Sequence, residues 1–207
     1  MKLPRPKRRL AAGDPSRHET RQLANGRQVH IRPITPADAE PIATGFHLLS
    51  DEEVRRRFLH PVKALSAEHL FQLTHPDPGR AFVLVVSEPL APGSALIGAV
   101  ARLAVTADDP GSAEFGLLVS HYISGLGLGK VLLQRLLDWA RRQGLREIWG
   151  DVLEENVPML QLAESLGSSA MARIPRPACG ASGGGWPESG GSKPRWQVIA
   201  AIVHRAA

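Results

Sequence analysis

Hydrophobic and polar residues follow regular spacings along most of the chain after residue 26. Short runs that are rich in Val, Ile and Leu, or that alternate apolar and polar residues, are typical of β-strands. They predict strands at residues 29–34, 81–87, 96–105, 113–119, 146–153 and 196–203. Helical spacing and helix-capping residues predict helices at 36–47, 51–58, 66–73, 128–144 and 156–167. The chain is therefore expected to mix α and β elements.

A tight turn joins two of the predicted strands. Residues 108–111 read Asp-Asp-Pro-Gly, residue types that favour turns, between the strands at 96–105 and 113–119. Because strands joined by a short turn pair antiparallel, these two are expected to form a β-hairpin.

A glycine-rich stretch lies between this hairpin and the most regular helix. The stretch comprises Ser124, Gly125, Leu126, Gly127, Leu128, Gly129 and Lys130. Glycines at a strand-to-helix junction leave backbone N–H groups uncovered, and the positive end of the helix dipole adds to their attraction for anions. The stretch is therefore expected to bind a phosphate or pyrophosphate.

Two common phosphate-binding motifs do not fit this stretch. A P-loop needs Gly-Lys followed by Ser or Thr, but Gly129-Lys130 is followed by Val131, and Ser124 stands where the first glycine is needed. A dinucleotide-binding loop needs a third glycine where Lys130 stands, and it follows the first strand of a βαβ unit rather than a hairpin. The ligand is therefore expected to be neither ATP nor a dinucleotide.

The chain resembles the GNAT superfamily of acyl-CoA-dependent N-acyltransferases. The signature of that family, Gln/Arg-x-x-Gly-x-Gly/Ala, falls on residues 124–129 with both glycines present, while Ser124 replaces the leading Gln or Arg. The resemblance extends over residues 29–167, and segments 57–59, 65–66 and 150–156 are similar to the protein-lysine acetyltransferase branch. It implies an α/β fold of the α+β type, with a mixed, largely antiparallel central sheet and helices on both faces.

The resemblance also implies a reaction. Acetyl-CoA would be the cosubstrate, without a metal, and a primary amine would attack it directly in a ternary complex. The preferred acceptor is a protein lysine side chain. A small-molecule amine remains an alternative, as does a non-catalytic acyl-CoA-binding or sensing module.

Glu114 is the candidate general base. It lies in Ala113-Glu114-Phe115, which matches the position of the base in the lysine-acetylating branch. Strand alternation places Glu114 and Gly116 on one face of the sheet and Phe115 on the other. An ion pair with Arg102 across the hairpin is the alternative role for this carboxylate.

Further candidate cofactor contacts follow from the resemblance. The backbone of Leu117, Leu118 and Val119 would pair with the pantetheine arm, and one N–H would polarise the thioester carbonyl. Asn156 would contact acetyl-CoA, or it would only cap the helix that follows. Many relatives have a tyrosine acid where Ala163 stands here, so the acid for the leaving thiolate is unassigned.

Composition limits the remaining possibilities. At 207 residues we expect one domain at 27–207, with a flexible Gly- and Pro-rich insertion at about 173–195 and a disordered basic tail at 1–26. The net charge is +5, but 5% aromatic residues offer little for base stacking, which argues against nucleic-acid binding. Cys179 is the only cysteine, as expected for a cytoplasmic protein, and the chain has no run long enough to span a membrane. The histidines show no metal-ligand spacing, and we expect a monomer or a homodimer.

Overall fold

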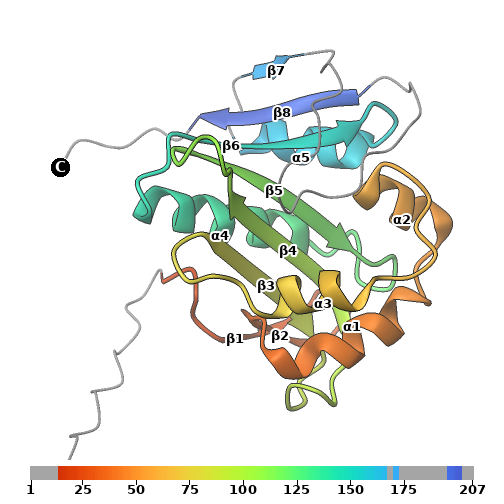
Figure 1. Cartoon of the computed structure of the whole chain (residues 1–207). Helices are drawn as coiled ribbons and strands as arrows, with labels where there is room; N and C mark the ends of the chain where they lie inside the picture. Colours follow the sequence, from red (N-terminus) through yellow and green to blue (C-terminus); the bar gives the residue numbers. More distant parts are fainter. Residues whose placement is uncertain (1–13, 167–169, 173–194, 202–207) are drawn as a thin grey trace, which may run out of the picture.

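A mixed eight-stranded sheet with helices on both faces forms the part of the chain that the computed structural model describes, residues 14–166, 170–172 and 195–201 (Figure 1). The strand order is β1-β2-β3-β4-β5-β6-β8-β7. Every neighbouring pair is antiparallel except β5 and β6, which run parallel. The structure therefore confirms the expected fold class.

The strands are β1 (Glu19–Gln22), β2 (Gln28–Pro33), β3 (Ala81–Ser87), β4 (Ile97–Val105), β5 (Ser112–Val119), β6 (Glu147–Leu153), β7 (Ala170–Ala172) and β8 (Arg195–Ala201). The helices are the short 3₁₀ turn η1 (Pro36–Asp38), α1 (Ala39–Phe46), α2 (Asp51–Phe58), α3 (Ala67–Thr74), α4 (Leu128–Arg142) and α5 (Val157–Ser165). Most of these elements lie within two residues of the bounds that the sequence pattern predicts.

The expected hairpin is present. β4 and β5 pair in register from Ala99 opposite Val119 to Val105 opposite Ala113. In the turn between them, the Asp109 carboxylate accepts a hydrogen bond from the Gly111 N–H (3.0 Å). This is the local side-chain bond that makes Asp a turn former.

The two faces of the sheet carry separate cores. α4 and α5 pack on one face, where Leu132 and Leu136 meet the inward side chains of β3, β4 and β5, such as Leu84. α1 and α3 pack on the opposite face, through a smaller cluster that includes Ile42 and Val85. Figure 1 shows α4 and α5 behind the strands and α3 in front of them. No helix in the described ranges is both long and apolar enough to cross a membrane.

One expectation about the N-terminal region is wrong. Residues 19–22 fall inside the segment 1–26 that the sequence pattern predicts to be disordered, yet they form β1, which pairs with β2 from Glu19 opposite Ile31 to Gln22 opposite Gln28. The strand has no apolar residue, so the hydrophobic pattern does not reveal it. It lies at the edge of the sheet, where backbone hydrogen bonds and the ion pairs of Glu19 hold it. Residues 1–13 and most of the predicted insertion, 173–194, lie outside the described residues.

Candidate active site

β5 and β6 separate at the centre of the sheet. Their parallel pairing includes three residue pairs and ends where Glu114 lies opposite Trp149. β5 continues from there to Val119, paired only with β4 among the described strands. Half-buried Leu117, Leu118 and Val119 therefore form one side of a gap between two parallel strands, as the resemblance implies for a pantetheine-binding backbone.

Glu114 lies where the strands begin to separate. It faces away from α4, as strand alternation predicts, because its neighbours Ala113 and Phe115 are buried in the α4 core. Arg102 on β4 shares its face, directly opposite Gly116 and therefore diagonal to Glu114. Burial lowers the pKa of Arg102, and the negative charge of Glu114 opposes this effect only in part. The two side chains are thus close enough for their charges to interact, while the ion pair itself stays a prediction.

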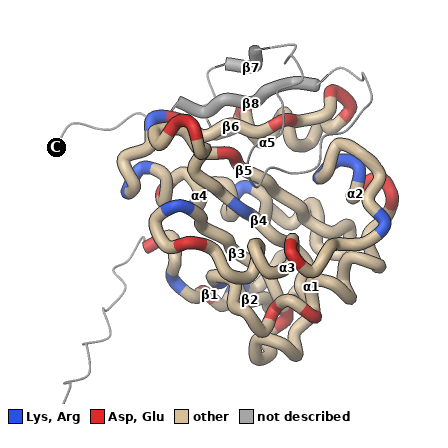
Figure 2. Tube along the Cα trace, in the orientation of Figure 1, with Lys and Arg blue, Asp and Glu red and all other residues tan. Residues whose placement is uncertain are grey.

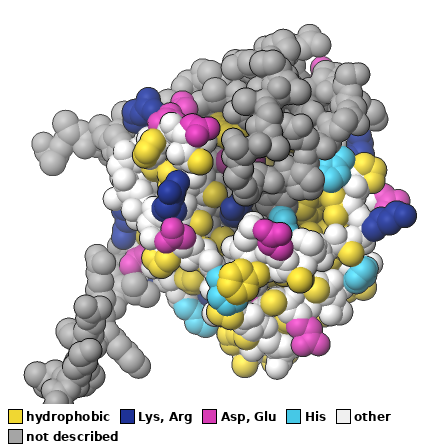
Figure 3. Space-filling model, viewed as in Figure 1, with side chains coloured by type: hydrophobic (Ala, Val, Ile, Leu, Met, Phe, Trp, Pro, Cys, Tyr) yellow, Lys and Arg dark blue, Asp and Glu magenta, His cyan; other side chains and the backbone are white. Residues whose placement is uncertain are grey.

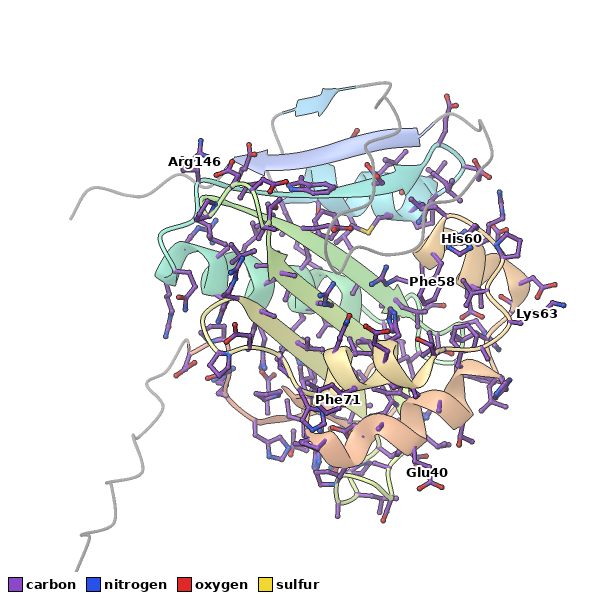
Figure 4. The ribbon with its side chains drawn as sticks, viewed as in Figure 1. Glu40, Phe58, His60, Lys63, Phe71 and Arg146 are labelled. Carbon is purple, nitrogen blue, oxygen red and sulfur yellow. The ribbon has the colours of Figure 1, made fainter. Side chains whose placement is uncertain are left out.

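Two further side chains reach this face from the helices. The guanidinium of Arg57, on α2, lies against the backbone of β5, since a Cβ built on Gly116 would come within 2.6 Å of its Cζ. His69, on α3, packs edge-on against Phe58, with the ring centroids 6.2 Å apart. Figure 4 places Phe58 between α2 and the sheet. Two arginines thus act on Glu114, and His69 and Phe58 lie on the side of Arg57.

Burial dominates the electrostatics of this cluster. It lowers the pKa of Arg57 to about 10, despite the opposing effect of Glu114. It also lowers the pKa of His69 to about 4, assisted by the charges of Arg57 and Arg102. His69 is therefore neutral at neutral pH and adds no positive charge to the site.

Glycine geometry shapes the start of α4. Gly125 and Gly127 have φ values of +72° and +75°, a left-handed conformation that suits glycine, and a Cβ on either would meet nothing within 4 Å. Gly127 is the N-cap of α4, so no side chain caps the helix, and its first turn has no acidic residue. The first N–H groups of a helix have no intrahelical acceptor. This end of α4 has the arrangement that binds anions.

The other residues of the stretch differ in what they can offer a ligand. Ser124 is exposed and its hydroxyl donates to the His121 carbonyl (3.2 Å), so it stabilises the loop itself. Lys130 is exposed in the first turn of α4, where its charge can meet an anion. Leu126 is partly buried and Leu128 almost completely buried, so Leu128 can contribute only its backbone. Gly129 allows α5 to approach, because a Cβ there would lie 3.2 Å from Leu162.

Asn156 caps α5, since its side chain accepts a hydrogen bond from the Met159 N–H (3.3 Å). This leaves the amide nitrogen as a donor for a ligand. Ala163 is buried, and the described tyrosine, Tyr122, is exposed and packs on His121 with ring centroids 3.9 Å apart. Within the described ranges, no group of three or more potential ligand side chains could hold a metal ion.

The sequence pattern does not identify Arg57 and His69 as site residues, although a signal for Arg57 exists. A lone glycine inside a strand often marks a close approach by another group. Gly116 is such a residue, and the Arg57 head occupies the space that its missing side chain leaves. His69 has no comparable signal.

Comparisons with known proteins agree with this geometry. The family model of the acetyltransferase (GNAT) domain matches residues 28–169. An acetyltransferase of Pseudomonas aeruginosa is 32% identical over 152 residues, covering 72% of this chain and 80% of that protein. The crystal structure of the GNAT domain of S. lividans PAT matches with a TM-score of 0.71 at 22% identity, covering 89% of this chain and 97% of that one. The structure of yncA from Salmonella typhimurium, solved with its cofactor acetyl-CoA, matches with a TM-score of 0.59 at 22% identity, covering 86% and 96%.

Proposed function

Because the chain belongs to the GNAT family of acetyltransferases, we propose that it transfers the acetyl group of acetyl-CoA to a primary amine, preferably a protein lysine side chain. The observation that carries this proposal is the separation of β5 from β6 directly beyond Glu114. Beyond Glu114, residues 117–119 of β5 pair only with β4 among the described strands, and the loop that follows leads to the uncapped N-terminus of α4, which supports the proposal. The acetyl-CoA held by yncA supports the same cosubstrate here.

The residues present fit acetyl-CoA. The N–H groups of residues 124–130 would hold the pyrophosphate, assisted by Lys130, and the absence of a carboxylate from the first turn of α4 avoids repulsion. The backbone of residues 117–119 would pair with the pantetheine arm, as an added strand pairs with a sheet edge. The Asn156 amide would be a further donor. Bound in this way, acetyl-CoA supplies an activated acetyl thioester at the strand gap.

Glu114 would remove a proton from the amine. A lysine ammonium has a pKa of about 10.4, so little nucleophile exists at neutral pH without a base. As the proton moves to Glu114, the C–N bond forms and the C–S bond breaks, and an N–H of residues 117–119 stabilises the charge on the carbonyl oxygen. As the C–S bond breaks, the nitrogen loses its second proton, and water passes this proton to the leaving thiolate, because Ala163 offers no acid. Glu114 then returns its own proton to the solvent.

A small-molecule amine is the second candidate acceptor. It is favoured by the two guanidiniums beside Glu114, since arginine is a preferred partner of carboxylates. An acceptor that carries its own carboxylate could therefore use Arg57 or Arg102 as an anchor. Incubating a cell lysate with the protein and labelled acetyl-CoA, then counting the protein-bound and small-molecule fractions separately, distinguishes the two acceptor classes.

Replacing the base tests the reaction. We expect Glu114→Gln to lower kcat about 100-fold, the usual contribution of a general base, while the Kd for acetyl-CoA in calorimetry is unchanged. Glu164→Gln, the same change at an exposed position on α5, should leave both values unchanged. Tight acetyl-CoA binding by the wild type without turnover on any amine would instead favour a sensing module. No binding at all would contradict the proposal.

A further inference from the structure

The helix α2 contacts a residue one to three positions before each of the three segments that we assign to acetyl-CoA. Figure 1 shows it beside the end of the sheet at which β5 and β6 separate. Its acidic residues lie in the first turn and its basic residues in the last, as Figure 2 shows. Three of these charged side chains, Glu53, Arg55 and Arg57, reach out of the helix to a different segment each.

Glu53 joins α2 to the loop before α4. Its side chain is 12% exposed and accepts hydrogen bonds from the backbone N–H of His121 (2.6 Å) and from the Ser50 N–H (2.8 Å), while its other contact is the His121 ring (3.0 Å to Nδ1). His121 in turn accepts the hydroxyl of Ser124, the first residue of the glycine stretch. Burial raises the pKa of Glu53, but the hydrogen bonds from Ser50 and His121 outweigh it and lower the pKa overall. Glu53 is thus a charged carboxylate that fixes the approach to the pyrophosphate loop.

Arg55 and Arg57 make the other two connections. Arg55 forms an ion pair with Glu155 (2.5 Å), the residue before Asn156. Arg57 lies on Gly116 of β5, directly before the strand edge 117–119 and on the same face as Glu114. The helix then ends at Leu59, a non-glycine residue with a φ of +65°. Such a conformation is strained for a leucine and persists where the surrounding contacts determine it.

We propose that Glu53 and Arg55 are positioning residues that couple the two substrate sites. The inference rests on the proposed function, because it takes the acetyl-CoA site as given. When acetyl-CoA orders the glycine loop and the Asn156 turn, these two contacts hold α2, and with it Arg57, whose charge acts on Glu114. Because such coupling is reciprocal, a bound acceptor raises the affinity for acetyl-CoA by the same factor by which bound acetyl-CoA raises the affinity for the acceptor.

Hydrogen exchange with acetyl-CoA as the probe tests the coupling without a known acceptor. In the wild type, saturating acetyl-CoA should slow amide exchange in residues 124–130. It should also slow exchange in residues 54–58, by at least about fivefold. Glu53→Gln keeps the helix cap, since Gln also serves at this position of a capping box. In this variant we expect the loop to remain protected by acetyl-CoA while α2 protection falls below about twofold. Arg55→Gln should do the same, and Arg55→Lys should restore the protection.

A neighbouring residue provides a matched control. Among the described residues Arg56 forms its ion pair only with Glu52 inside α2, so Arg56→Gln should keep the full acetyl-CoA effect on residues 54–58. A purely structural role would speed α2 exchange equally with and without acetyl-CoA, which would overturn the inference. So would a wild type whose loop is protected while α2 is unaffected. The absence of protection in both regions would instead contradict the proposed acetyl-CoA site.

Discussion

At the level of single residues, the backbone of Gly127 carries much of the proposed anion site. At its φ of +75°, a residue with a side chain is strained, although a Cβ there would meet no neighbour within 4 Å. Gly144, at the other end of α4, has a φ of +74° and equally open space around it. We predict that Gly127→Ala and Gly144→Ala each lower the free energy of unfolding by about 1 kcal/mol. Only Gly127→Ala should also raise the Kd of acetyl-CoA, about tenfold, because it disturbs N–H groups that hold the phosphates.

Urea unfolding and calorimetry measure the two effects separately. Equal Kd values for wild type and Gly127→Ala would show that the loop backbone does not bind the phosphates. A similar loss of affinity in Gly144→Ala would show that the effect comes from the general stability of α4.

A site residue could be predicted from the sequence when it lies close in the sequence to the other residues of the site. Glu114 and the glycines belong to one strand-loop-helix unit, so spacing alone locates them near one another. Arg57 and His69 come from helices more than forty residues earlier, and only tertiary packing brings Arg57 to Glu114 and His69 to Arg57. Gly116 records the approach of Arg57 without showing which side chain approaches.

At the level of elements, a buried ion pair connects β2 to the turn η1. Arg32 and Asp38 are 7% and 0% exposed, and both Asp38 oxygens accept hydrogen bonds of 2.7 Å from the guanidinium. Removing one partner leaves a buried charge uncompensated. We predict that Asp38→Asn lowers the free energy of unfolding by about 3 kcal/mol, measured by urea unfolding at pH 7. Asp109→Asn breaks an equally short but exposed pair with Arg146 and should cost less than about 1 kcal/mol.

The same pair should produce a defined pH dependence. Burial raises the pKa of Asp38, but hydrogen bonds from Arg32 and Thr35 outweigh it and hold the pKa below its ordinary value. A depressed carboxylate pKa stabilises the folded state above the unfolded value of about 3.9, and this contribution is lost as the pH falls further. The stability difference between wild type and Asp38→Asn should therefore be largest above about pH 4 and shrink toward pH 2. A difference independent of pH would contradict this role of Asp38.

Elements were predictable where burial imposes a hydrophobic period. β3 and α2 have the predicted bounds, because one is an apolar run and the other a capped helix with a Ser50-Glu53 capping box. β1 was not predictable in this way. The sequence Glu-Thr-Arg-Gln contains no apolar residue, and the strand forms through pairing with β2 and through the contacts of Glu19.

At the level of the whole molecule, Arg135 connects the central helix α4 to the edge strand β1. Its guanidinium donates to the Arg17 carbonyl (2.9 Å) and pairs with Glu19, more than a hundred residues away in the sequence. Burial lowers the pKa of Arg135, opposed by Glu19, which is the pattern of a partly desolvated ion pair. The edge strand β1 is thus attached to the central helix by this side chain as well as to β2.

Removing this connection should loosen one edge and leave the rest of the sheet intact. We predict that Arg135→Met, which retains the apolar part of the side chain, speeds amide exchange of β1 about tenfold while β3 exchanges at the wild-type rate. Arg141→Met is the matched control, because Arg141 pairs only with Asp138 one turn earlier on the exposed face of the same helix. Equal acceleration in β1 and β3 would mean that Arg135 supports global stability instead, and unchanged β1 exchange would mean that pairing with β2 alone holds the strand. Because three strands, β2, β3 and β4, separate β1 from β5, the Kd for acetyl-CoA should stay at the wild-type value in both variants.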